Sequence, residues 1–267
     1  MRKVLDELGV RPDRNKGQNF LMDMGVLERQ LKAARLTQGD TVMEVGAGLG
    51  ILTWELSARA RKVISYEMDQ RLVEYLSVGL PENVDLRPVD ALEDEWPPFD
   101  KMVSNLPYGI SSPLLFKLLD SDFALAILLL QKEFADRLVA GPRTKSYGRL
   151  TVAAARLATI ELLETVPPTA FHPQPRVESA LVSITPSRRF PVADPALFDE
   201  LLRVVFSQRR KMLRNSLGSA RDRLVPNIGV EEGKGFLGDL EMGSARPEGL
   251  TPEELGMRAD AIFGLRE

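Results

Sequence analysis

The 267-residue sequence contains no cysteine and only one histidine, His172. The absence of cysteine excludes disulfides, thiolate metal sites and cysteine nucleophiles. A single histidine cannot form a histidine-rich metal site and argues against a conventional Ser-His-Asp triad. We therefore expect no metal centre.

Long hydrophobic runs are also missing. The longest, Phe123 to Leu130, is far shorter than the roughly 20 residues that a membrane-spanning helix needs. The N-terminal stretch lacks the apolar core of a signal peptide, and the net charge of −3 creates no overall positive field for nucleic acid. An apolar fraction of 44% suffices for a real core. We expect a cytoplasmic protein, soluble and monomeric, with one large domain or two of unequal size.

The first two-thirds of the chain alternates short apolar runs with helical patterns, which is typical of a parallel sheet covered by helices. The predicted strands are Thr41–Val45, Lys62–Tyr66, Val84–Pro88, Lys101–Ser104, Ala124–Leu130, Ala158–Thr165 and Ser179–Pro186. The predicted helices between them are Leu49–Ala58, Asp69–Gly79 and Pro113–Leu119.

The pattern changes near residue 187, where a Pro-rich, charged stretch leads into helices without strands. These helices are predicted at Pro195–Phe206, Lys211–Leu217, Val230–Leu237 and Pro252–Phe263. We therefore predict an α/β domain over residues 1–187 and a smaller helical domain over residues 188–267.

The stretch "VMEVGAGLGILTWEL" predicts a strand, a glycine-rich turn and the start of a helix. Gly46, Gly48 and Gly50 follow a G-x-G-x-G spacing, and Ile51 stands where the dinucleotide fingerprint G-x-G-x-x-G has its third glycine. Glu44 lies two residues before the first glycine. This combination resembles motif I of the S-adenosylmethionine methyltransferases; a simple tight strand–helix turn is the alternative.

Acidic residues end the next two predicted strands. Glu67 closes "KVISYE", where a carboxylate can accept both hydroxyls of a ribose. Asp90 follows the third strand, where a carboxylate can accept from an adenine amino group. Each residue alone fits a helix cap or a solvated turn. Together with the glycine loop they predict an S-adenosylmethionine site at the carboxyl edge of a Rossmann-like sheet.

The segment Asn105-Leu106-Pro107-Tyr108 follows the fourth predicted strand and resembles the [DNS]-[PLI]-P-[YFW] motif of amino-methyltransferases. The lone pair of an adenine exocyclic amine is delocalised into the ring, so the amine is a poor nucleophile. The Asn105 side-chain oxygen and the Leu106 carbonyl can accept its two hydrogens, Pro107 can fix the turn, and Tyr108 can stack on the base. We expect Phe171 to provide the opposite stacking face. A turn with a surface tyrosine is the alternative.

Six motifs occur in the order found in one family: "KGQNFLMD" (Lys16–Asp23), "EVGAGLGILT", "NLPYGISSP", "KSYGRLTV", "FHPQPRVESALV" and "FSQRRKMLRNSL". Over about residues 10 to 220 the chain resembles the KsgA (RsmA) type of rRNA adenine N6,N6-dimethyltransferase. The resemblance implies that Gln18, Asn19 and Leu21 help to cover S-adenosylmethionine, alongside Gly46, Gly48, Glu67, Asp90 and Asn105. It also implies a substrate, two adjacent adenines near the 3′ end of 16S rRNA within a pre-ribosomal particle, and a role in small-subunit biogenesis.

Basic residues gather locally in spite of the net negative charge. Those predicted to contact RNA phosphates are Arg143, Lys145, Arg149, Arg209, Arg210, Lys211 and Arg214. Such contacts are salt-dependent and mostly independent of sequence. A solvated charged face is the alternative for any single cluster.

Two other functions remain open from the sequence. An Erm-type 23S rRNA adenine methyltransferase shares the "QNFL" and "NLPY" patterns, although Leu106 stands where Ile is commoner in that group. A ribosome-assembly factor with little activity is the second, and the intact Glu67, Asp90 and Asn105 argue against it. A small-molecule methyltransferase would leave the basic clusters unexplained.

Overall fold

The computed structural model describes residues 2–10, 18–224 and 245–264. The chain divides into two compact units. The first contains residues up to Ala135 together with Ile160–Pro186, and the second contains Asp136–Thr159 together with the residues from Ser187 onward.

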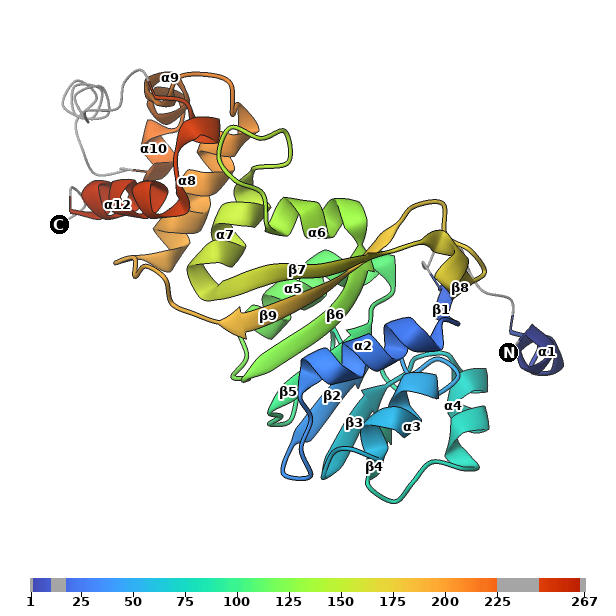
Figure 1. Cartoon of the computed structure of the whole chain (residues 1–267). Coiled ribbons are helices and arrows are strands. Elements are labelled where there is room, and N and C mark those ends of the chain that lie inside the picture. Colours follow the sequence, from blue (N-terminus) through green and yellow to red (C-terminus); the bar gives the residue numbers. More distant parts are fainter. Residues whose placement is uncertain (1, 11–17, 225–244, 265–267) are drawn as a thin grey trace. The chain divides into compact units, whose positions relative to one another are not determined.

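A seven-stranded sheet forms the centre of the first unit, in the order β4-β3-β2-β5-β6-β9-β7 (Figure 1). Its strands are β2 (Thr41–Val45), β3 (Lys62–Tyr66), β4 (Val84–Arg87), β5 (Lys101–Asn105), β6 (Leu125–Gln131), β7 (Ala158–Val166) and β9 (Ser179–Pro186). β2 to β6 pair in parallel, and β9 pairs antiparallel with β6. The prediction of a Rossmann-like α/β sheet is confirmed.

The order of the strands fixes where a ligand can bind. The chain passes from β2 outward to β3 and β4, then returns to place β5 on the other side of β2. Such a reversal is the switch point at which open α/β sheets bind ligands, beyond the carboxyl ends of the strands. β2 and β5 pair only at Val42↔Lys101 and Met43↔Met102. Beyond that point the Ser104 hydroxyl accepts the Val45 N–H at 2.9 Å, which satisfies a buried donor where the strands diverge.

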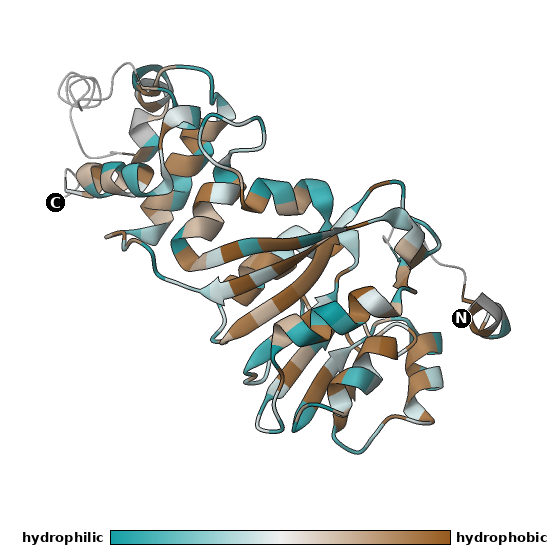
Figure 2. Cartoon of the chain, viewed as in Figure 1, coloured by the Kyte–Doolittle hydropathy of each residue, from teal (hydrophilic) through white to brown (hydrophobic). Residues whose placement is uncertain are grey.

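Helices cover both faces of this sheet. α2 (Met24–Ala34), α3 (Ile51–Ser57) and α4 (Gln70–Ser77) lie on one face, and α5 (Ser111–Leu119) lies on the other (Figure 1). β6 is hydrophobic along most of its length, as expected for a strand buried on both sides (Figure 2). α6 (Lys132–Leu138) follows β6.

Helix α2 was not predicted, although the sequence contains signals for the start, the buried face and the end of a helix. The Asp23 side chain caps its first turn by accepting from Gly25 N and Val26 N. The buried positions repeat at helical spacing, and the helix ends at Arg35 in a left-handed conformation. The short elements α1 (Arg2–Glu7), β1 (Phe20–Leu21) and β8 (Phe171–His172) were missed as well.

The second unit is helical where it is described. Its helices are α7 (Arg149–Leu157), α8 (Pro195–Ser207), α9 (Leu213–Ser219), α10 (Arg221–Leu224) and α12 (Pro252–Phe263). α7 and α12 both pack against α8. The helix predicted at residues 230–237 lies outside the described residues, as does the beginning of the Lys16–Asp23 motif.

The chain passes between the two compact units at more points than the single boundary predicted near residue 187. The last crossing between the units does fall at Pro186–Ser187, but residues 136–159 also belong to the second unit. The reason is tertiary contact: the Tyr147 hydroxyl donates to the Leu250 carbonyl at 2.6 Å, and Arg156 lies over the Phe198 ring at 5.8 Å. The sequence of residues 136–159, which precede most of β7 and follow β6, contains no local pattern that predicts these contacts.

Candidate functional site

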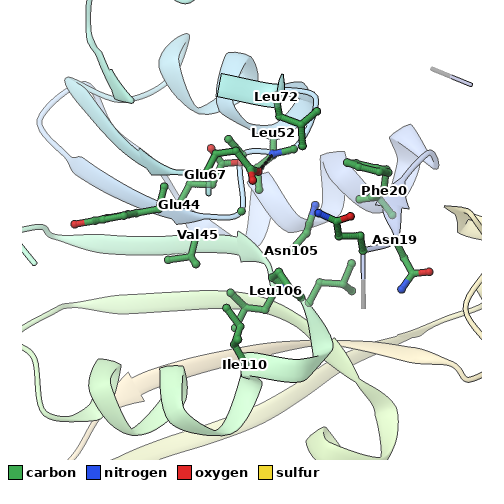
Figure 3. A pocket seen from close by; sticks show the side chains of 18 of the residues that line it. Asn19, Phe20, Glu44, Val45, Leu52, Glu67, Leu72, Asn105, Leu106 and Ile110 are labelled. Atoms are coloured by element: carbon green, nitrogen blue, oxygen red, sulfur yellow. Dashed lines mark hydrogen bonds between the residues drawn. The ribbon is translucent and has the colours of Figure 1, made fainter. Parts of the chain in front are cut away.

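A cavity of about 410 Å³ opens at the carboxyl ends of β2, β3 and β5 (Figure 3). All the residues predicted for the cofactor and the amine line it: Gln18, Asn19, Leu21, Gly46, Gly48, Glu67, Asp90, Asn105, Leu106, Pro107, Tyr108 and Phe171. The fold thus brings segments that are far apart in the chain to one place.

The glycine-rich loop forms the floor of this cavity. Gly46 and Gly48 have φ values of +86° and +60°, a left-handed region that side chains with a Cβ rarely adopt. The N–H groups of Gly46 and Ala47 donate to the Tyr66 carbonyl at 2.8 and 3.0 Å, which ties the loop to the end of β3. A Cβ at Gly48 would lie 3.1 Å from the Phe20 ring, so a side chain there would crowd the cavity.

Glu67 is held in place by the backbone. Its two carboxylate oxygens accept from Gly48 N and Asp69 N, each at 2.9 Å. Burial raises the pKa of this carboxyl, and the backbone N–H bonds oppose the rise. A carboxylate oriented in this way retains lone pairs for hydroxyl donors in the cavity.

Glu44 supports the loop from behind. The residue is 1% exposed, and one carboxylate oxygen accepts from the Thr53 and Ser65 hydroxyls at 2.6 and 2.7 Å. Burial raises the pKa of Glu44 to about 7. These bonds join β2, β3 and α3 beneath the glycine loop, a structural role that the sequence pattern did not reveal.

Asp90 lies near the start of the loop that follows β4. Its Oδ1 accepts from Leu92 N at 2.9 Å, which forms a local turn. The residue also lines the cavity. Asp90 can therefore form the turn and also bind a ligand, because its carboxylate lies at the cavity.

The Asn105–Tyr108 segment forms the side of the cavity beyond β5. Leu106 N donates to the Leu129 carbonyl at 3.2 Å, and a Cβ at Gly46 would lie 3.5 Å from Pro107 Cδ. The two motifs are thus in contact at the switch point. The Asn105 Oδ1 atom is buried and has no hydrogen-bond partner within the described part of the chain. An acceptor in this condition is suited to a donor brought by a ligand.

Tyr108 is half-buried and anchored at its hydroxyl, which lies 2.6 Å from the Ser179 hydroxyl. Burial raises the pKa of Tyr108, and the Ser179 bond opposes the rise. The phenol is therefore neutral at physiological pH, which suits a stacking surface rather than a base.

Phe171 lines the cavity but is only 4% exposed. Its ring packs in the core with Leu21, Leu27 and Leu129. β8 pairs with β1 through Leu21↔Phe171, so the N-terminal motif and the Phe171 segment are held together. The stacking role of Phe171 stays a prediction.

The apolar walls of the cavity were not predicted. They include Ile51, Leu52, Met68, Leu72, Val89 and Ile110. Each lies within a few residues of a predicted motif or in α4. Proximity to the motifs in the sequence could therefore have indicated most of these wall residues. The walls supply the mainly apolar surface typical of a cofactor pocket.

The predicted RNA-contacting residues all lie in the second unit. Six of them are exposed: Arg143, Lys145, Arg149, Arg210, Lys211 and Arg214. Arg209 differs because its guanidinium donates to the Lys145 and Tyr147 carbonyls at 2.8 and 3.0 Å. Arg209 therefore has a structural role within this unit.

Neither a metal site nor a membrane span is present among the described residues. No group of three or more His, Asp or Glu side chains among them is arranged to hold a metal ion. No described helix is long and apolar enough to cross a bilayer.

Comparison with known families gives a match over most of the chain. Residues 11–233 match the model of the family described as "Ribosomal RNA adenine dimethylase". A probable ribosomal RNA small subunit methyltransferase A from Methanosarcina acetivorans is 46% identical over 253 residues, which cover 93% of each chain. The protein of the same name from Thermococcus gammatolerans is 40% identical over 255 residues, covering 94% of this chain and 90% of that one.

Solved structures give a consistent picture. A dimethyladenosine transferase from Plasmodium falciparum is similar with a TM-score of 0.82 at 30% identity, covering 92% of this chain and 98% of that one. The 23S rRNA methyltransferase ErmE is similar with a TM-score of 0.65 at 29% identity, covering 92% and 100%.

Proposed function

Because the chain belongs to the ribosomal RNA adenine dimethylase family, we propose that it dimethylates the N6 amines of two adjacent adenines near the 3′ end of small-subunit rRNA. The names of its relatives support the small subunit as the source of the substrate. The unpartnered Asn105 Oδ1 at the cavity wall carries the proposal of an amine acceptor.

S-adenosylmethionine, when bound, would supply a methyl group activated by its sulfonium; the S–CH3 bond would break and S-adenosyl-L-homocysteine, a neutral thioether at sulfur, would be the product. The residues that would hold it all line the cavity. Glu67 is oriented to accept ribose hydroxyls, because Gly48 N and Asp69 N already fix its position. Asp90 lines the cavity and would accept an adenine amine, and the apolar walls would exclude water from the bound cofactor. Gln18, Asn19 and Leu21 enclose the cavity from the N-terminal segment.

The target amine would be held by Asn105 and Leu106. When its hydrogens are accepted by the Asn105 side-chain oxygen and the Leu106 carbonyl, the nitrogen lone pair is freed from the ring and can be aimed at the methyl group. Catalysis is then mainly orientation and electrostatic fit, and the proton leaves to solvent after the nitrogen becomes cationic. No general base is required, in keeping with the neutral Tyr108.

A base inside a duplex cannot reach such a pocket, so the substrate adenine is unpaired or flipped. Tyr108 supplies one stacking face, worth about 1–3 kcal/mol. Phe171 is the candidate for the other face, and its ring edge must become accessible for that contact. The exposed basic side chains of the second unit, from Arg143 to Arg214, would contact phosphates of the pre-ribosomal particle.

The decisive experiment supplies S-adenosylmethionine to small and large ribosomal subunits stripped of their methyl marks and maps the modified bases. We expect dimethylated adenines near the 3′ end of the small-subunit rRNA. Label confined to large-subunit rRNA would instead assign the chain to the Erm-type activity of its structural relative. Tight binding to the particle without label would assign it to assembly alone.

A further inference from the structure

Lys117 lies in α5, the helix that begins at Ser111, shortly after the Asn105–Tyr108 motif. Its ammonium group donates to three backbone carbonyls of one loop: Ala91 and Leu92 at 2.9 Å and Asp94 at 2.5 Å. We propose that Lys117 is a positioning residue that fixes the Asp90 loop for the cofactor's adenine. This inference rests on the proposed S-adenosylmethionine site.

The Lys117 ammonium group uses all of its hydrogen-bond donors on carbonyls of this loop. An ammonium group has three N–H donors, and each finds a carbonyl here. The Lys117 Nζ also lies 4.9 Å from the centre of the Trp96 ring, a favourable cation–π distance. The Trp96 indole N–H donates to the Ala91 carbonyl at 2.7 Å, so two donors converge on one acceptor.

The loop needs this support because residues 88–100 form neither helix nor strand. Its other side is held by the Asp94 carboxylate, which accepts from the Tyr66 hydroxyl at 2.9 Å and from Arg87 at 3.0 Å. The loop is thus fastened to β3 through Tyr66 and to α5 through Lys117. Tyr66 immediately precedes Glu67, so these bonds connect the loop to the proposed ribose-binding strand end.

The segment that runs from Asn105 through α5 therefore has two roles. Its start provides Asn105 for the amine, and its helix provides Lys117, which holds the Asp90 loop. Asp90 Oδ1 accepts from Leu92 N, and Lys117 holds the carbonyls of Ala91 and Leu92. Removing the ammonium group therefore releases the turn that aims Asp90 into the cavity.

Lys101 offers a matched control. It is a partly buried lysine on β5 whose Nζ donates to the Arg35 carbonyl at 2.7 Å and contacts Asp40 at 3.0 Å. Lys101 begins β5, so it lies at the end of the strand opposite the cavity. A substitution there also removes a lysine–carbonyl bond but leaves the Asp90 loop untouched.

The test measures S-adenosylmethionine binding by calorimetry in the full-length chain without RNA. We expect Lys117→Met to raise the Kd about tenfold, the factor that corresponds to 1.4 kcal/mol, while Lys101→Met leaves it within about twofold of wild type. Once RNA transfer is assayed, Lys117→Met should raise the KM for S-adenosylmethionine more than it lowers kcat. An unchanged Kd in Lys117→Met, or an equal loss in both variants, overturns the proposal.

Trp96 provides a direct readout of the loop. The chain has two tryptophans, Trp54 and Trp96, so Trp54→Phe leaves Trp96 as the only tryptophan, which can be excited selectively. In that background Lys117→Met should shift the emission to longer wavelength as the loop opens to water. An unshifted emission contradicts the inference.

If Lys117→Met does not fold, Lys117→Gln is tested in its place. Glutamine is neutral and shorter than lysine, so it cannot satisfy the three carbonyls either. An unchanged Kd in folded Lys117→Gln then overturns the proposal. These outcomes are separable from the proposed function. A wild-type chain that binds S-adenosylmethionine but modifies no rRNA contradicts the function alone.

Discussion

The hydroxyl groups of Tyr108 and Ser179 lie 2.6 Å apart, although 71 residues separate them in the chain. Tyr108 follows β5, and Ser179 begins β9, where it is fully buried. The contact holds the tyrosine ring at the cavity wall from β9, which lies between β6 and β7 in the sheet. The position of Tyr108, the predicted stacking surface, is therefore set in part by a residue outside its motif.

The first prediction concerns this pair. We expect Ser179→Ala and Tyr108→Phe each to lower kcat about fivefold, which corresponds to the loss of one hydrogen bond of about 1 kcal/mol. Since Ser179 acts only through the tyrosine hydroxyl, the double variant should be no slower than either single one. Single-turnover methylation of small-subunit rRNA measures the rates. Additive losses would show that Ser179 does not act through Tyr108.

The second prediction concerns Asn105. Asn105→Ala removes the unpartnered acceptor, so transfer should fall about 10²–10³-fold. The affinity for S-adenosylmethionine should fall far less than in Glu67→Ala, which removes the proposed ribose acceptor. Calorimetry gives the binding and a methyl-transfer assay the rate. Near-normal turnover in Asn105→Ala would mean that amine orientation is not the mechanism.

The third prediction concerns the glycine loop. Gly48→Ala places a Cβ 3.1 Å from the Phe20 ring at a φ of +60°, so we expect about 1–2 kcal/mol of strain and weaker cofactor binding. Gly79→Ala is the matched control, because a Cβ there meets nothing within 4 Å. Binding of S-adenosylmethionine to both variants separates local strain from a general effect. Equal affinities would contradict this prediction.

The fourth prediction is a pH dependence from Glu44. The pKa of this carboxyl rises from 4.5 to about 7 on folding because of burial. The folded chain therefore binds the proton more tightly than the unfolded chain, and this contribution to stability is lost as pH rises from 4.5 to 7. Glu44→Gln removes the titration. Relative to wild type its free energy of unfolding should gain about 3 kcal/mol across that range, as measured by urea unfolding. A constant difference would contradict the burial argument.

The fifth prediction separates two arginines of the same motif. Arg209→Ala removes the bonds to the Lys145 and Tyr147 carbonyls, so the unfolding free energy should fall by about 2 kcal/mol. Arg214 is exposed, so Arg214→Ala should leave stability unchanged. It should reduce the salt slope of RNA binding by about 0.7, the value for one phosphate contact on a single strand. A thermal melt and a salt titration distinguish the two effects.

Local patterns alone determined much of this protein. The strands Thr41–Val45, Lys62–Tyr66 and Ser179–Pro186 have the bounds that their apolar runs predict. The family was also identified correctly from its motifs. These successes share a cause, because strand periodicity and motif spacing are properties of short segments. Gly46, Glu67, Asp90 and Asn105 each follow or end a strand, and the carboxyl ends of parallel strands lie at one edge of the sheet.

Tertiary structure decided what no segment records. The membership of residues 136–159 in the second unit depends on partners such as Leu250, about a hundred residues away. The support of Tyr108 by Ser179 and of the Asp90 loop by Lys117 depends on side chains that reach across the fold. The sequence predicts which groups bind a cofactor and an amine. Only packing determines which neighbours hold those groups still, because hydrogen bonds form between atoms that are close in space, whatever their distance along the chain.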